Sequence, residues 1–181
     1  HRDLHSFPTR RSSDLNANPE TSQGGHPNVH YTVGAAAVIL EIDKQTGKMH
    51  IKKVVEAIDA GKALNPNLVE GQIIGGLMQG ISTVLYEEMK FDHRGKMLNP
   101  NFTDYKIPTA LDIPDEIVPI IVEVAQPDGP FGARGVGEHP MIPAAPMIAN
   151  AIDDALGIRI KSMPITAEKV CLEILAKGKK K

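Results

Sequence analysis

A glycine-rich loop that carries one carboxylate is the part of this sequence best suited to chemistry. The loop is GARGVGEHP at 132–140. Glycine accepts positive φ and lets a bulky group come close to the backbone, so Gly132, Gly135 and Gly137 predict a loop that holds a ligand. Glu138 follows as a carboxylate that could act as a general base. The alternative interpretation of Glu138 is a capping acid in a glycine turn.

Glu138 precedes a predicted helix, and this position has two opposed effects on its carboxylate. The apolar run that follows has helical spacing, with Pro143 or Pro146 in its first turn and Gly157 at its end. The helix dipole stabilises a carboxylate at this end by about 0.3–1 kcal/mol. Burial in a closed pocket would instead raise the pKa of the carboxyl. A base poised to take up a proton is one outcome of this balance.

Three further segments, together with the loop, carry a family resemblance. They are VEGQIIGGLMQG at 69–80, NPNFTDYKIPTALDIP at 99–114 and GIRIKSMPIT at 157–166. In this order the four segments resemble the C-terminal part of the molybdenum-binding large subunit of the xanthine dehydrogenase/aldehyde oxidase family of molybdenum hydroxylases. The resemblance runs from about Tyr31 to Leu175. It implies part of a molybdopterin-binding domain.

The resemblance also implies roles for individual residues. Glu138 would be the base that deprotonates a hydroxide bound to molybdenum, and Gly135 and Gly137 would lie against the cofactor. Gln72 would lie against the molybdopterin. The dithiolene of the pyranopterin would hold the metal, so no protein ligand to the metal is expected. His139 departs from the family pattern, in which many members have proline; it could hydrogen-bond to Glu138 or face solvent without a role.

The implied activity is the oxidation of an aldehyde or an N-heterocycle, such as a purine, with water as the oxygen source. The implied cofactor is a molybdenum-pyranopterin, with or without an attached nucleotide. Electrons would leave through iron–sulfur clusters and FAD on partner subunits of a hetero-oligomer, because the single Cys171 cannot supply the four cysteines of a cluster. The fragment alone is expected to be inactive. The alternative function is a non-catalytic scaffold or an anion-binding module derived from this family.

Hydrophobic periodicity predicts a hairpin followed by a long helix. The β-rich runs 33–43 and 49–61 are separated by turn residues and predict two paired strands, the first of them buried on both faces. A helix is predicted over 65–90 with Asn65 as its N-cap.

Gln72 is a polar residue among apolar and glycine neighbours in this predicted helix. An unpaired buried amide costs about 1–3 kcal/mol, so its partner would be either a cofactor or a neighbouring backbone carbonyl. Glycines at 71, 75, 76 and 80 cost about 1 kcal/mol each relative to alanine. This cost indicates that another helix or a ligand packs closely against the helix, and helix packing is favoured for Gly75, Gly76 and Gly80.

The second half of the chain alternates irregular and regular segments. Residues 91–131 contain several prolines and predict a long irregular excursion that includes a strand over 117–124. Another strand is predicted over 158–166, followed by a helix capped by Thr166. The predicted fold class is therefore α+β, a mixed sheet with packed helices.

Composition bears on partners and location. The net charge is −2, the pI is about 6.4, and no basic stripe with interleaved aromatic residues is present, so nucleic acid is not an expected partner. No apolar run reaches about 18 residues, which argues against a membrane span. One cysteine cannot form an internal disulfide, so the expected location is the reducing cytoplasm.

The first 30 residues differ from the rest of the chain. Residues 1–15 have neither helical nor strand periodicity and are interpreted as a non-native leader. Residues 16–30 are polar and rich in Gly, Pro and Asn, and are interpreted as a loop or linker. Residues 31–181 are assigned to the C-terminal part of the molybdopterin-binding domain.

Overall fold

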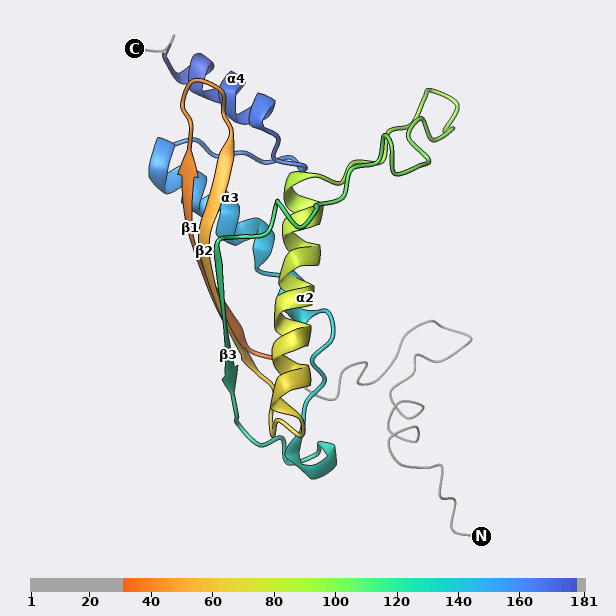
Figure 1. Cartoon of the computed structure of the whole chain (residues 1–181), viewed down its shortest axis with the longest axis vertical. Coiled ribbons are helices and arrows are strands. Elements are labelled where there is room, and N and C mark those ends of the chain that lie inside the picture. The colour runs from red at the N-terminus through yellow and green to blue at the C-terminus, as the bar shows by residue number, and fades with distance from the viewer. Residues whose placement is uncertain (1–30, 179–181) are drawn as a thin grey trace, which may run out of the picture.

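The computed structural model describes residues 31–178, so the predicted leader and linker lie outside the described residues (Figure 1). In chain order the elements are β1 (Gly34–Ile42), β2 (Met49–Asp59), α2 (Pro66–Leu85), β3 (Glu116–Val122), the 3-10 turns η1 (Pro130–Gly132) and η2 (His139–Met141), α3 (Ala144–Leu156) and α4 (Ala167–Gly178).

The three strands form one mixed sheet in the order β1-β2-β3. β1 and β2 are antiparallel, with Val38 opposite Val54, and β2 and β3 are parallel, with Val54 opposite Ile117. Gly47 adopts a φ of 72° in the hairpin turn, where its N–H donates to the Asp43 carbonyl oxygen at 2.7 Å. The predicted hairpin, mixed sheet and α+β class are confirmed.

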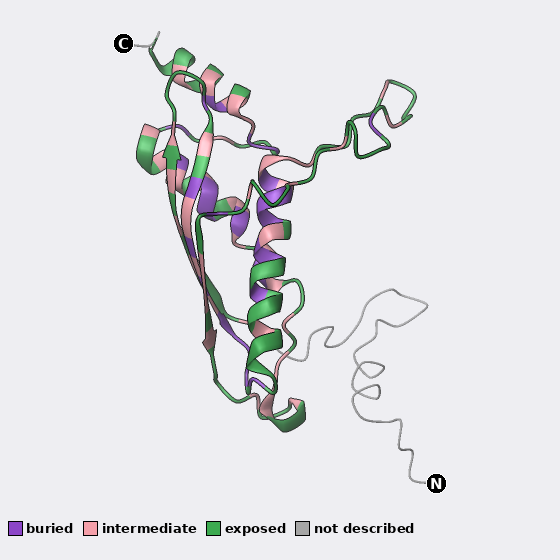
Figure 2. Ribbon diagram, in the orientation of Figure 1, coloured by how far each residue is buried: buried purple, intermediate pink, exposed green. Residues whose placement is uncertain are grey.

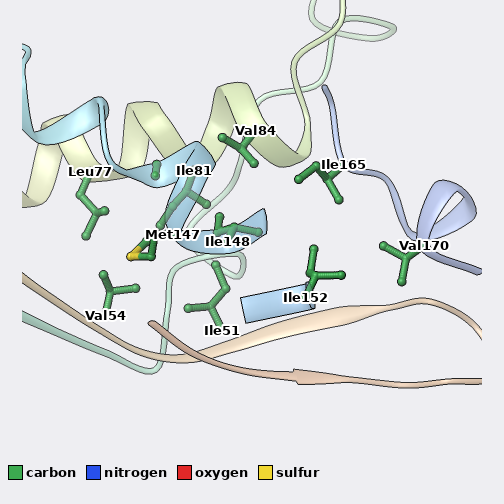
Figure 3. Packing of buried hydrophobic residues seen from close by; sticks show 11 residues of the cluster. Ile51, Val54, Leu77, Ile81, Val84, Met147, Ile148, Ile152, Ile165 and Val170 are labelled. Carbon is green, nitrogen blue, oxygen red and sulfur yellow. The ribbon is translucent and has the colours of Figure 1, made fainter. Parts of the chain in front are cut away.

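β1 is not buried on both faces, contrary to the expectation from its apolar sequence. It is an edge strand whose residues alternate in burial: Ala36, Val38 and Leu40 pack against the core, whereas Ile39 is 61% exposed. In the described part of the chain, α2 and α3 lie over one face of the sheet (Figure 3). The outward side chains of β1 therefore lack a second layer to cover them.

The core lies between the sheet and the helices α2 and α3. Figure 3 shows apolar side chains of these elements pointing toward one another, joined by Ile165 from the connection after α3 and Val170 from α4. The buried members that it labels are Ile51, Val54, Leu77, Ile81, Val84, Met147, Ile148, Ile152, Ile165 and Val170. Burying one such side chain contributes about 1.5–3 kcal/mol, so this cluster fixes α2 on the sheet. Figure 2 shows long exposed stretches in the N-terminal half of α2.

The long helix begins where the sequence predicts and ends earlier. Asn65 caps α2, because its Oδ1 accepts the Leu68 N–H at 3.1 Å. The predicted extension to residue 90 is wrong: the N–H groups of Tyr86 and Glu87 both donate to the Ser82 carbonyl oxygen and close the last turn. The Glu87 carboxylate also accepts the Ser82 hydroxyl, and Tyr86 leaves helical geometry at the C-cap with a φ of −124°.

The predicted strand at 158–166 is absent from the structure. The helices on either side of it are as expected, since α3 ends and α4 begins at the predicted residues. Ile158 and Ile165 of this segment are buried, but the Ile165 N–H donates to the Val84 carbonyl oxygen at the end of α2 rather than to the sheet. Gly157 ends α3 at φ 62°, and the Thr166 hydroxyl accepts the Lys169 N–H at 3.2 Å at the start of α4. The segment is therefore an irregular connection that buries Ile158 and Ile165 and leaves most of the residues between them exposed.

The irregular excursion predicted over 91–131 begins earlier than expected: residues 86–115, between α2 and β3, project from the C-terminal end of α2 (Figure 1). The Asn99 side chain ties two segments of this excursion together near α2. Its Oδ1 accepts the Lys90 N–H at 2.9 Å, and its Nδ2 donates to the Glu88 carbonyl oxygen at 2.7 Å. Tyr105 donates its hydroxyl to the Glu87 carboxylate at 2.5 Å.

Within residues 31–178, α2 is one helix that is long and apolar enough to cross a membrane by length and composition alone. A core helix passes the same test, and Ile73, Leu77 and Ile81 of α2 are completely buried against the rest of the domain. One face of the C-terminal half of α2 therefore packs in the core, whereas most of its N-terminal half is exposed.

Candidate active site

The first half of the glycine-rich loop is tied to the end of β2 by backbone hydrogen bonds. The Arg134 N–H donates to the Ala60 carbonyl oxygen at 2.9 Å, and the Lys62 N–H donates to the Gly132 carbonyl oxygen at 2.7 Å. Gly61 lies between them at φ 63°, and a Cβ added there would come within 2.8 Å of the Arg134 nitrogen. Glycine at position 61 therefore allows the loop to reach the sheet.

A buried ion pair reinforces this attachment. Arg134 Nη1 lies 2.8 Å from Asp59 Oδ2, and the two side chains are 12% and 9% exposed. Asp59 Oδ1 accepts the N–H groups of Gly61 at 2.9 Å and Val124 at 3.2 Å, while Arg134 Nη1 also donates to the Tyr31 carbonyl oxygen at 3.0 Å. This pair was not predicted from the sequence, where its signal was the one arginine among the loop glycines.

Only Gly132 of the three loop glycines adopts the positive φ expected of them. Gly132 has a φ of 80°, whereas Gly135 and Gly137 are not in the positive-φ region. A Cβ added at Gly135 or Gly137 would meet no atom within 4 Å. These two exposed glycines therefore leave open space beside the backbone, which a bulky group could approach.

Glu138 is exposed at the start of η2. Its side chain makes no capping hydrogen bond, and no interaction with another described residue engages its carboxylate. The backbone carbonyl oxygen of Glu138 accepts the Met141 N–H at 3.2 Å. A capping role for the side chain is therefore without support in the structure, and the carboxylate is free to meet a ligand.

Close packing of η2 on α2 sets the position of Glu138. A Cβ added to Gly76 would lie 3.0 Å from Pro140 Cβ, and one added to Gly80 would lie 2.5 Å from the Met141 carbonyl oxygen. Close helix packing is therefore confirmed for Gly76 and Gly80. It is wrong for Gly75, which is exposed and has no atom within 4 Å of an added Cβ.

Gln72 lies on the exposed side of α2 and lines a groove with the glycine-rich loop. The groove has a volume of about 210 Å³, and Lys62, Ala133, Arg134 and Val136 are among its other lining residues. We call it the Gln72 groove. Gln72 is exposed and has no partner among the described residues, so it is neither buried nor bonded to a backbone carbonyl. Its amide can donate to and accept from a polar ligand.

Glycines on α2 leave the surface beside Gln72 open to a polar, planar cofactor. Gly71 and Gly75 flank Gln72 on α2, and a Cβ added at either would meet no atom within 4 Å. With Gly135 and Gly137, they leave four places where a ligand could reach backbone. The residues present therefore fit a pyranopterin. Among residues 31–178, no cluster of three or more His, Cys, Asp or Glu could hold a metal ion.

His139 follows Glu138 but points elsewhere. It is half-buried, so it is not the solvent-facing histidine that one expectation described, and its Nδ1 is buried without a hydrogen-bond partner in the described structure. It lines a second pocket of about 230 Å³ with Thr32, Ile58 and Pro143, apart from the Gln72 groove.

Glu56 is a buried carboxyl that the sequence analysis did not identify. It lies on β2 with no exposed surface, and neither carboxylate oxygen has a partner among the described residues. Desolvation raises the pKa of Glu56 to about 7. Its sequence signal was a glutamate at a core-facing strand position, two residues from Val54 and Ile58, which are both buried.

Comparison with known proteins identifies the family. Residues 5–114 match the model of the molybdopterin cofactor-binding domain. This chain belongs to that family. The match begins inside the segment 1–15 and includes residues outside the described structure, so the interpretation of that segment as a leader stays a prediction.

Curated relatives of this molybdopterin-binding chain are large oxidoreductase subunits. The putative xanthine dehydrogenase molybdenum-binding subunit XdhA of Escherichia coli (strain K12) is 38% identical over 146 residues, which are 80% of this chain and 19% of that protein. Subunit gamma of the 6-hydroxypseudooxynicotine dehydrogenase complex of Paenarthrobacter nicotinovorans is 37% identical over 144 residues, 78% of this chain and 18% of that protein. The chain thus spans about a fifth of these relatives.

Solved structures agree with this assignment. Quinoline 2-oxidoreductase from Pseudomonas putida 86 aligns with a TM-score of 0.73 at 38% identity, over 78% of this chain and 18% of that chain. The aldehyde oxidoreductase of Desulfovibrio gigas aligns with a TM-score of 0.77 at 32% identity, over 91% of this chain and 18% of that chain. The predicted family membership is confirmed, and the fold is that of part of these oxidoreductases.

Proposed function

We propose that this chain forms part of a molybdenum hydroxylase that oxidises an aldehyde or an N-heterocycle with water as the oxygen source, and that Glu138 is its general base. One observation carries the proposal. The free, exposed carboxylate of Glu138 lies two residues beyond Val136, which lines the same groove as Gln72. The loop that carries the candidate proton acceptor thus also lines the groove of the candidate cofactor-binding amide.

Each proposed site residue has a distinct task. When bound, the molybdenum-pyranopterin cofactor would supply the two-electron oxidation of the substrate carbon. Gln72 would bind the polar cofactor through its amide, and Gly135 and Gly137 would let it approach the backbone. Glu138 would accept a proton at a carboxylate oxygen from the water-derived nucleophile.

The exposure of Glu138 in this chain is compatible with such a role. A general base must come within about 2.6–3.2 Å of the atom that gives up the proton, and a carboxylate without a protein partner can do so. Cofactor and substrate, once bound, would cover this carboxylate and exclude water from it.

The proposed enzyme needs partners that this chain does not provide. Iron–sulfur clusters and FAD on other subunits or domains would accept the electrons, in a hetero-oligomer. The relatives include a complex subunit and a molybdenum-binding subunit, which supports this arrangement. Cys171 is a free thiol, and we place the protein in the cytoplasm.

The deciding experiment replaces Glu138 by glutamine in a full-length large subunit that contains this chain. Glutamine keeps the side-chain volume but cannot accept the proton, so turnover should fall by about 10²–10⁴-fold. Molybdenum content and the thermal unfolding midpoint should remain unchanged, because the side chain makes no bond in the fold. Glu41→Gln, at an exposed position of β1, is the control for loss of one carboxylate.

The outcome separates catalysis from the alternative function. Near-normal turnover at full molybdenum occupancy would refute Glu138 as the base. A full-length subunit that binds no molybdenum and has no oxidase or dehydrogenase activity would favour the scaffold or anion-binding module.

A further inference from the structure

The glycine-rich loop has two halves with different attachments. Up to Arg134, backbone bonds to Ala60 and Lys62 hold it on the end of β2. From Gly135 to Gly137 the loop is open, with no atom near the added Cβ positions at either glycine. The direction in which the open half leaves the sheet is therefore set at Arg134, four positions before Glu138.

The side chain of Arg134 is held more firmly than its exposed neighbours. Nη1 contacts both Asp59 Oδ2, at 2.8 Å, and the Tyr31 carbonyl oxygen, at 3.0 Å. The second oxygen of Asp59 is engaged by the N–H groups of Gly61 and Val124. One carboxylate therefore connects the ends of β2 and β3 to the loop.

We infer that Asp59 and Arg134 are positioning residues that hold Glu138 in its working place through their ion pair. This inference rests on the proposed function. Their side chains are engaged with each other and with backbone groups, so we assign them a role in positioning and none in proton transfer. The pair fixes the start of the open half of the loop, and a displacement of about 1 Å at a catalytic group can lower turnover about 100-fold.

Arg134→Gln removes the charge that pairs with Asp59 and keeps most of the side-chain length. In the chain itself, amide hydrogen exchange in a peptide covering residues 133–141 should become at least about 5-fold faster, while exchange in α2 stays unchanged. In the full-length subunit, turnover per bound molybdenum should fall about 10–100-fold with KM changed less than about 2-fold. Counting turnover per molybdenum excludes loss through unfolded protein.

Two further variants make the test specific. Arg134→Lys should restore turnover to within about 3-fold of the unaltered enzyme, because a single atom, Nη1, makes both contacts and an ammonium can replace it. Arg159→Gln removes the same charge from an exposed pair with Asp153 and should change neither exchange nor turnover.

The results distinguish this inference from the proposed function. If Glu138→Gln is inactive while Arg134→Gln turns over normally, the positioning role is wrong and the catalytic role stands. If Arg134→Gln accelerates exchange in α2 as much as in the loop, the pair is a general stabilising contact and the inference fails. If Glu138→Gln is fully active, the proposed function fails, whereas loop-specific exchange would still establish that the pair orders residues 135–138.

Discussion

Gly80 of α2 lies so close to Met141 that a Cβ on the glycine would be 2.5 Å from the methionine carbonyl oxygen. The same added atom would be 2.7 Å from Ala144 Cβ. This contact joins the core helix to the turn that follows Glu138. The position of the candidate base therefore depends on the absence of one methyl group in α2.

Alanine substitutions along α2 should have opposite effects on stability. Gly80→Ala forces a backbone carbonyl away from the helix and should lower the free energy of unfolding by about 1–3 kcal/mol. Gly75→Ala is the matched control, since an added Cβ there meets nothing, and it should raise stability by up to about 1 kcal/mol through helix propensity. Urea unfolding measures both, and a stabilising Gly80→Ala would show that η2 does not pack on α2 as described.

Gln72→Ala should weaken cofactor retention without weakening the fold. The side chain is exposed and unpaired in the described structure, so the free energy of unfolding should change by less than about 0.5 kcal/mol. Each lost amide bond to the cofactor would cost about 0.5–1.5 kcal/mol of binding. Molybdenum content of the full-length subunit is the readout, with Asn67→Ala on the same helix as control. Normal content would remove Gln72 from the site.

The stability of the chain should fall as the pH rises from about 4.5 to 7, because of Glu56. Its pKa is about 7 in the folded chain against an ordinary value of 4.5, so the folded state holds the proton more tightly. The contribution is fully present below pH 4.5 and is lost as the pH rises through 7. The shift corresponds to a loss on the order of 3 kcal/mol.

Glu56→Gln should remove most of this pH dependence. The amide is neutral at every pH, so the variant should be more stable than the unaltered chain at pH 8 and should gain nothing at pH 4.5. Urea unfolding at several pH values tests this, with Glu41→Gln as an exposed control. An identical pH dependence for Glu56→Gln and the unaltered chain would mean that Glu56 is not buried as a neutral acid.

Asn65→Ala should destabilise the chain by about 1 kcal/mol, because it removes the acceptor for the Leu68 N–H at the start of α2. Asn65→Asp keeps an acceptor oxygen and should retain the stability. Thermal unfolding of both variants gives the comparison. Equal losses would show that the cap does not stabilise α2.

Local chemistry accounts for what the sequence could predict. The caps at Asn65, Gly157 and Thr166 each depend on residues within one helical turn, so their positions follow directly from the sequence. The exposed outer face of β1 did not follow, because burial depends on which layers cover the sheet. The segment 158–166 has strand-like alternation, but its backbone pairs with the end of α2 instead.

The candidate site was predictable only in part, because some of its contacts depend on the tertiary fold and leave no local pattern. The open glycines and Glu138 stand together in one loop, and Gln72 stands out within one helix. The Asp59–Arg134 pair joins residues from distant parts of the chain, and no local pattern marks it. Glu56 required knowledge of which face of β2 meets the core.

The ties that hold the glycine-rich loop join residues that are far apart along the chain. Arg134 and Tyr31 are 103 positions apart, and Val124 and Asp59 are 65 apart. Closing such long segments lowers the chain entropy before the contacts form and stabilise the loop. We therefore expect the helices to form on the hairpin first and the loop to dock last during folding, so that the surface carrying Glu138 is completed only after the core beneath it.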